Sequence, residues 1–267
     1  MRISLPLGLA LAATLATGAL AAEAGPGHAL PPKDVSFSFE GPFGTYDRAA
    51  LQRGFQVYKE VCSACHSLNR VAFHALADEG GPGFTEAQAK AIAAGYKVPA
   101  GPNDKGETTD ANGTPLTRLG ILADHFPAPF PNDEAARTAN NGALPPDLSI
   151  IEKARNGGAH YVYSILTGFG EKPPAGFKVI DGKYYNPYFE GWNISMPPPL
   201  NANSVTYSDG TKATVEREAH DVVTFLAWAG EPKMEERKRM GFGVMLFLIA
   251  FAGVLFLSYR KLWADQH

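Results

Sequence analysis

The sequence predicts a mostly α-helical domain with long loops rich in glycine and proline, followed by one C-terminal transmembrane helix. Three observations lead to this prediction. Apolar residues recur at spacings of three and four in several short segments, strand-like alternation is scarce, and a long uncharged apolar run lies near the C-terminus. The 267 residues include 28 glycines and 21 prolines, so we expect the helices to be separated by turn-rich connections.

Residues 1–21 are predicted to be a secretory signal peptide. A single early cation, Arg2, precedes an uncharged apolar run that ends in a small-residue pattern at Ala21. An N-terminal membrane anchor is the alternative, but the run is short for a membrane span and rich in Ala, Thr and Gly. We therefore expect export, cleavage and a mature chain that begins near Ala22.

The exported domain, residues 22–230, contains five predicted helices. They cover residues 47–60, 85–95, 149–157, 159–167 and 214–230. The first and last of these carry an apolar stripe on one face, as expected for helices that pack on a core. The second and third begin with capping boxes, formed by Thr85 with Gln88 and by Ser149 with Glu152, and both end at glycine.

The C-terminal end is predicted to anchor the protein in a membrane. Residues 231–240 form a charged linker, and the uncharged residues 241–259 are long enough to cross a hydrocarbon core of about 30 Å. Lysines and arginines are more numerous before this span than after it, which by itself favours the opposite orientation. Because large domains are exported largely regardless of flanking charge, the signal peptide outweighs this count. We expect a single-pass protein of the bacterial inner membrane, with residues 260–267 in the cytoplasm and the domain on the periplasmic side.

The exported domain is acidic. Residues 22–230 hold 17 Lys and Arg against 23 Asp and Glu, a net charge of −6. This charge argues against nucleic acid as a ligand and suits a cationic partner. The need to keep the domain soluble explains this net charge equally well.

The two cysteines of the chain lie together in VCSACH, residues 61–66. A Cys-x-x-Cys pair serves as a redox dithiol, as half of a zinc site, or for covalent attachment of haem. A zinc site needs two further ligands at a finger-like spacing, which the nearest histidines, His66 and His74, do not have. A redox dithiol is expected at the start of a helix in a βαβ unit, and no such pattern is nearby.

Haem attachment accounts for the whole motif. Two thiols can add to the two haem vinyl groups while the adjoining histidine reaches the iron. The predicted export of the domain agrees with haem attachment. The sequence therefore predicts that Cys62 and Cys65 are the thioether donors and that His66 is the proximal iron ligand.

The second axial ligand is predicted to be Met196. Of the five methionines, Met196 is the one in the exported domain, and the proline run 197–199 holds the following backbone extended. The alternative role for a methionine is core filling. Four histidines remain rivals for the ligand position, namely His74, His125, His160 and His220.

Several longer motifs resemble a known family. They are NNGALPPDLS (140–149), YVYSILTG (161–168), YYNPYFEG (184–191) and MPPPL (196–200), together with the haem motif and the single C-terminal span. From about Phe37 to the end of the span, the chain is similar to the cytochrome c1 family. That family is the haem c subunit of the quinol:cytochrome c oxidoreductase, the cytochrome bc1 complex.

The resemblance implies further properties. It agrees with one haem c held by Cys62, Cys65, His66 and Met196. It also places the propionate-binding arginine on Arg155, with Tyr161 and Asn140 near the haem. It implies a class-I-like cytochrome c domain, with cytochrome b and the Rieske iron–sulfur protein as neighbouring subunits and a soluble or tethered, cationic c-type cytochrome as the electron acceptor. Some bacterial members have an extra cysteine pair, which this chain lacks.

With His and Met both bound, the iron has no open position, so we expect electron transfer without bond chemistry by this chain. Two other functions stay open. One is a membrane-tethered cytochrome that feeds a different complex, such as a terminal oxidase. The other is a small haem peroxidase, which would need an open iron position.

Overall fold

The computed structural model describes residues 27–264, so the predicted signal peptide lies outside the described residues. The described part is mostly helical, as predicted. Its α-helices are α1 (Arg48–Glu60), α2 (Glu86–Ala94), α3 (Asp133–Ala139), α4 (Gly158–Thr167), α5 (Val215–Gly230) and α6 (Met234–Leu262). Single 3₁₀ turns occur at η1 (Cys62–Ala64) and η2 (Phe73–Leu76). Two antiparallel pairs join β1 (Lys97–Pro99) to β2 (Thr117–Leu119) and β3 (Tyr184–Tyr185) to β4 (Asn193–Ile194).

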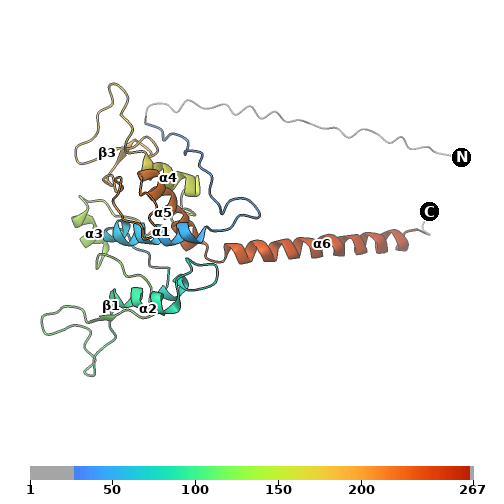
Figure 1. The fold of residues 1–267 in the computed structure, drawn as a ribbon, viewed down its shortest axis with the longest axis horizontal. Coiled ribbons are helices and arrows are strands. Elements are labelled where there is room, and N and C mark those ends of the chain that lie inside the picture. Colours follow the sequence, from blue (N-terminus) through green and yellow to red (C-terminus); the bar gives the residue numbers. More distant parts are fainter. Residues whose placement is uncertain (1–26, 265–267) are drawn as a thin grey trace.

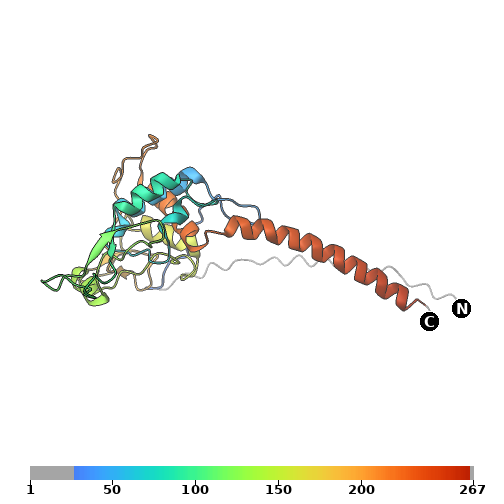
Figure 2. The same ribbon diagram turned by 90° about the horizontal axis from the view of Figure 1, so that it is seen from below.

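Figures 1 and 2 show two parts: helices α1 to α5 gather with their loops in one body, and α6 projects from it as a single long helix. Within that body α5 packs against both α1 and α4. Four of the five helices predicted for the domain are confirmed at their expected places. Helix α3 was not predicted.

The helix starts follow from local capping. Asp47 accepts hydrogen bonds from the backbone N–H groups of Ala49 (2.9 Å) and Ala50 (3.3 Å) at the start of α1. Thr85 and Gln88 form the predicted capping box of α2. These side chains satisfy N–H groups that have no partner within the helix.

The predicted helix at 149–157 is wrong, because these residues form a series of turns. The Ser149 hydroxyl, which would have capped the helix, instead accepts a hydrogen bond from the backbone N–H of Arg70 at 3.0 Å. Gly157, where the predicted helix would end, adopts a left-handed conformation with φ of 84° and instead precedes α4. The tertiary contact thus overrides the local capping signal.

The core is built on the crossing of α1 and α5. A Cβ atom at Gly54 would lie 2.0 Å from the carbonyl oxygen of Asp221, so glycine allows the two backbones to touch. Four buried aromatic side chains surround the crossing: Phe55, Tyr58, Phe225 and Trp228. Each such side chain stabilises the fold by about 1.5–3 kcal/mol through burial, so the crossing contributes much of the domain's stability.

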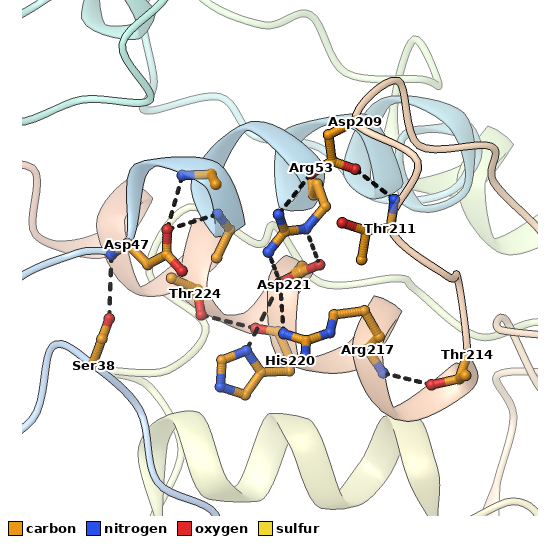
Figure 3. Close-up of polar contacts among 12 residues, drawn as sticks. Ser38, Asp47, Arg53, Asp209, Thr211, Thr214, Arg217, His220, Asp221 and Thr224 are labelled. Atoms are coloured by element: carbon orange, nitrogen blue, oxygen red, sulfur yellow. Dashed lines mark hydrogen bonds and ion pairs between the residues drawn. The ribbon is translucent and has the colours of Figure 1, made fainter.

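A buried ion pair reinforces the same crossing (Figure 3). Nε of Arg53 on α1 donates to Oδ2 of Asp221 on α5 at 2.7 Å, and NH2 donates to Oδ1 at 3.2 Å. NH1 of Arg53 also donates to Asp209 at 2.9 Å, in the loop that precedes α5. The Asp221 side chain is fully buried, so loss of Arg53 would leave a buried carboxylate without its closest cation.

The first turns of helix α6 are joined to the domain by hydrogen bonds. Glu235 accepts hydrogen bonds from the backbone N–H of Tyr46 (2.8 Å) and from Arg48 (2.6 Å), and Lys238 donates to the carbonyls of Phe39 (2.7 Å) and Gly44 (3.0 Å). Residues 234–240, assigned to a linker from the sequence, are therefore the first turns of the helix.

Within residues 27–264, α6 is the one helix long and apolar enough to span a membrane. Its 29 residues extend about 44 Å, against about 30 Å of hydrocarbon, and its apolar window is exposed. The predicted span, residues 241–259, lies inside it.

A cavity of about 250 Å³ lies beside the base of α6, and Glu152 is part of its lining. The Glu152 side chain is only 8% exposed, and its nearest cation, Nζ of Lys153, lies 3.8 Å away. Lys153 bonds instead to Glu231 at 2.8 Å. Burial raises the pKa of Glu152 from its ordinary value of 4.5 to about 7.

Glu152→Gln is therefore expected to stabilise the domain at high pH only. The unfolded carboxyl ionises near pH 4.5 and the folded one near pH 7, so the wild-type chain loses up to about 3 kcal/mol of stability as pH rises through this window. The variant lacks this loss. Thermal unfolding of the detergent-solubilised chain at about pH 5 and pH 8 measures the difference. An equal gain at both pH values would contradict the assignment.

Candidate haem-binding site

The Cys-x-x-Cys-His motif lies in a tight turn at the end of α1. The carbonyl oxygen of Cys62 accepts hydrogen bonds from the N–H groups of Cys65 (3.1 Å) and His66 (2.9 Å). Cys62 is half-buried against the main core, whereas Cys65 is exposed, and the two thiols are not joined. The turn thus presents two free thiols and an imidazole from one short segment.

The pKa of the Cys62 thiol disfavours a redox dithiol. Burial, with a smaller contribution from the charge of Cys65, raises the pKa of the Cys62 thiol to about 12. Redox dithiols instead have a thiol of low pKa. Among residues 27–264, no group of three or more His, Cys, Asp or Glu side chains is arranged to hold a metal ion.

The imidazole of His66 is oriented by the backbone. Its Nδ1 lies 2.8 Å from the carbonyl oxygen of Pro146. A carbonyl only accepts, so Nδ1 carries the proton and Nε2 holds the lone pair that a metal needs. Burial lowers the pKa of His66, an effect partly offset by its hydrogen bond to Pro146. The ring is therefore in its neutral, metal-binding form at pH 7.

Asp147 holds the Pro146 loop beside the motif. One carboxylate oxygen accepts from the Ser67 hydroxyl (2.8 Å) and the Asn69 N–H (2.9 Å), and the other accepts from the Ser149 N–H (2.8 Å). Burial alone would raise the pKa of Asp147, but these hydrogen bonds outweigh it and the pKa is lowered. A single carboxylate thus fixes the carbonyl that orients His66.

Asp147→Ala is expected to destabilise the haem-binding turn. Three donors lose their acceptor, which costs about 2–4 kcal/mol when each loses about 1 kcal/mol. Thermal unfolding of the intact protein measures the loss. Asp78→Ala is the matched control, because Asp78 makes an exposed pair with His74 that is worth less than about 1 kcal/mol. Equal stability of the two variants would contradict the role given to Asp147.

Met196 lies just after β4 and is half-buried. It packs against an apolar group from α4, β4 and the intervening loop, here called the methionine cluster. The cluster consists of Ile165, Tyr188 and Ile194 with the partly buried Tyr161, Phe169 and Phe189. On the other side of Met196, the proline run leads to Leu200 in the main core. The thioether is thus carried by a segment that is fixed at both ends.

The three residues named from the family resemblance, Arg155, Tyr161 and Asn140, have different surroundings in the structure. Arg155 is exposed, and within residues 27–264 its guanidinium makes no ion pair. Burial raises the pKa of Tyr161, and the charge of Arg155 opposes this increase. Asn140 instead donates its amide N–H to the carbonyl of Ala136 at 2.7 Å and closes the end of α3. Its amide therefore has a structural partner already.

Three of the rival histidines have other partners. His74 pairs with Asp78, His160 with Glu40 and the Lys33 carbonyl, and the ring of His220 stacks on Phe37. His125 forms a backbone bridge with Ala72. The structure brings His66 to Pro146 and Asp147, and Met196 to Tyr161. Sequence reasoning missed Pro146 and Asp147, although both lie in the motif NNGALPPDLS.

Two thiols, an oriented imidazole and a thioether are the donor types that a c-type cytochrome uses, and the described residues include one apolar C-terminal helix. The model of the Cytochrome C1 family matches residues 37–266. The chain belongs to the cytochrome c1 family.

Known relatives agree with this assignment. The chain is 47% identical to "Cytochrome b/c1" of Bradyrhizobium diazoefficiens, over 99% of this chain and 40% of that protein. It is 46% identical to "Cytochrome c1 1, heme protein, mitochondrial" of Arabidopsis thaliana, over 88% of this chain and 73% of the relative. It is 45% identical to "Cytochrome c1" of Rhodospirillum rubrum, over 86% of each. The chain thus spans two fifths of the first relative and most of the other two.

Proposed function

We propose that the chain binds one haem c through thioether bonds to Cys62 and Cys65, with His66 and Met196 as axial ligands, and that it transfers electrons in a cytochrome bc1 complex. The observation that carries the proposal is the Nδ1 hydrogen bond of His66 to Pro146 in a turn with two free thiols. When bound, the haem supplies a reversible one-electron couple. The donor set matches such a group in number and chemistry.

The chain's own residues then set the properties of that couple. Pro146 orients His66, and the fixed segment around Met196 supplies a thioether, so neither axial position is left for a substrate. The methionine cluster packs apolar side chains against Met196 and so lowers the polarity of its surroundings. Both a thioether ligand and a low-dielectric surrounding favour the reduced state. Arg155, an exposed cation, is assigned to a haem propionate.

The proposal extends to the fold and the partners. The domain is a class-I-like cytochrome c domain, an assignment that the close crossing of α1 and α5 supports. Its neighbours are cytochrome b and the Rieske protein, which donates the electron, and its acceptor is a cationic c-type cytochrome. The name of the Bradyrhizobium relative, "Cytochrome b/c1", supports cytochrome b as a neighbour. Residues 22–230 lie on the periplasmic side, and α6 anchors them.

Co-purification tests this placement against a cytochrome that feeds another complex. The full chain, tagged and extracted from native membranes in a mild detergent, is expected to bring with it b-type haem and a Rieske iron–sulfur signal. Quinol should then reduce its haem c. Recovery with the haems of a terminal oxidase, and without the Rieske signal, would contradict the proposal.

A further inference from the structure

The segment YYNPYFEG is one of the motifs on which the family resemblance rests, and so far it has no role. Its centre, Asn186, is a fully buried polar residue, at 0% exposure. Its side-chain Nδ2 donates to the carbonyl of Ile165 at 2.8 Å, and its Oδ1 accepts from the N–H of Tyr188 at 3.1 Å. Its backbone N–H donates to the carbonyl of Trp192 at 3.0 Å. Asn186 therefore connects three separate stretches of chain.

The most informative of these bonds is the one to Ile165. Ile165 lies in the last turn of α4, where backbone carbonyls have no partner within the helix. The amide of Asn186 supplies that partner. The fit is close, because a Cβ atom at Gly168 would lie 2.7 Å from Oδ1 of Asn186. Asn186 thus joins the end of α4 to the β3–β4 hairpin with no spare room.

The β3–β4 hairpin that Asn186 joins to α4 continues into the segment that carries Met196. Tyr184 of β3 pairs with Ile194 of β4, and Met196 follows Ile194 by two residues. Ile165 and Tyr188, the two hydrogen-bond partners of the Asn186 side chain, are themselves core members of the methionine cluster. The amide of Asn186 therefore holds the backbone of two residues of the cluster against which Met196 packs.

We propose that Asn186 is the positioning residue for the axial thioether, acting through the carbonyl of Ile165 and the N–H of Tyr188. The proposal rests on the proposed role of Met196 as a ligand. Loss of the amide leaves two buried backbone groups without partners, which favours conformations in which the hairpin moves away from α4. Met196 would then be held less firmly in its position, and an external ligand could compete with its thioether.

The test uses Asn186→Leu in the full-length haem-loaded protein in native membranes, with carbon monoxide added to the reduced sample. The fraction of carbon monoxide-binding haem is expected to rise about tenfold, which corresponds to about 1.4 kcal/mol, the scale of a lost buried hydrogen bond. The sulfur-to-iron charge-transfer band should weaken and the midpoint potential fall. The haem should stay covalently attached, because Cys62 and Cys65 are untouched.

Asn193→Ala is the matched control. Asn193 lies in the same hairpin and its side chain bonds to the Ile180 N–H (2.9 Å) and the Gly191 carbonyl (3.0 Å), with no bond to α4. It should leave carbon monoxide binding unchanged even if it lowers stability. A role of Asn186 in stability alone would make the two variants alike in this assay.

Asn186→Asp keeps the test decisive if Asn186→Leu does not accumulate. The aspartate can still accept from Tyr188, but it can donate to Ile165 only when protonated, and burial raises its pKa. Carbon monoxide binding should therefore be stronger at about pH 8 than at about pH 5, with no such trend in the wild type.

Met196→Leu separates failure of this proposal from failure of the ligand assignment. If Met196→Leu binds carbon monoxide while both Asn186 variants stay as inert as Asn193→Ala, the positioning role is overturned. If Met196→Leu is itself inert, the ligand assignment fails, and the positioning role fails with it.

Discussion

Met196→Leu is expected to lower the midpoint potential of the haem by on the order of 0.1 V or more, because axial ligands set haem potentials over a range of about 0.8 V. The same variant should lose the sulfur-to-iron charge-transfer band and bind carbon monoxide. Leucine keeps the apolar contacts of Met196 with the methionine cluster, so the surrounding fold should persist. Redox titration and optical spectroscopy of the purified protein measure these changes.

Met245→Leu provides the control for this prediction. Met245 is an exposed residue of α6, far along the chain from the haem motif, and its replacement should change none of these signals. If Met196→Leu gave an unchanged spectrum and potential, the sixth ligand would have to be a different residue. The rival histidines, His74, His125, His160 and His220, would be replaced next.

Gly54→Ala is expected to have the largest effect on stability. The added methyl group would lie 2.0 Å from the carbonyl oxygen of Asp221 and 2.8 Å from Cβ of Phe225, so α1 and α5 would have to separate. Separation would loosen the aromatic core and the Arg53–Asp221 pair together. We expect a loss of about 3 kcal/mol or more, measured as a lower unfolding temperature and a lower yield of haem-loaded protein.

Gly101→Ala is the corresponding control, because a Cβ atom there meets nothing within 4 Å. The comparison removes the general effect of replacing glycine by alanine. Unfolding temperatures that agree for the two variants would show that the α1–α5 contact does not limit the fold.

The sequence was informative where the signal is local. Apolar stripes and capping residues predicted α1, α2 and α5, and an uncharged run predicted the apolar part of α6. The turn at 149–157 could not be foreseen, because Ser149 is engaged by Arg70, 79 residues away. Helix α3 was missed because its seven residues are too few to show an apolar stripe.

Local signals and long-range contacts differ in the same way at the candidate site. Cys62, Cys65 and His66 lie within five residues of the chain, so the prediction that they attach a haem comes from the motif alone. Pro146 orients His66 across 80 residues, and nothing in the local sequence indicates that contact. Asn186 likewise bonds to Ile165 across 21 residues. Residues that orient ligands depend on tertiary structure, whereas the attachment motif depends on spacing in the chain.

The most direct test of the account is whether haem is covalently bound to Cys62 and Cys65. Intact-mass measurement of the denatured mature chain from native membranes, with a pyridine haemochrome spectrum, determines this. The account predicts a chain that keeps its colour after denaturation and exceeds the polypeptide mass by one haem, and a Cys65→Ser variant in which this attachment is weakened or lost. A colourless chain with two free thiols would contradict the account.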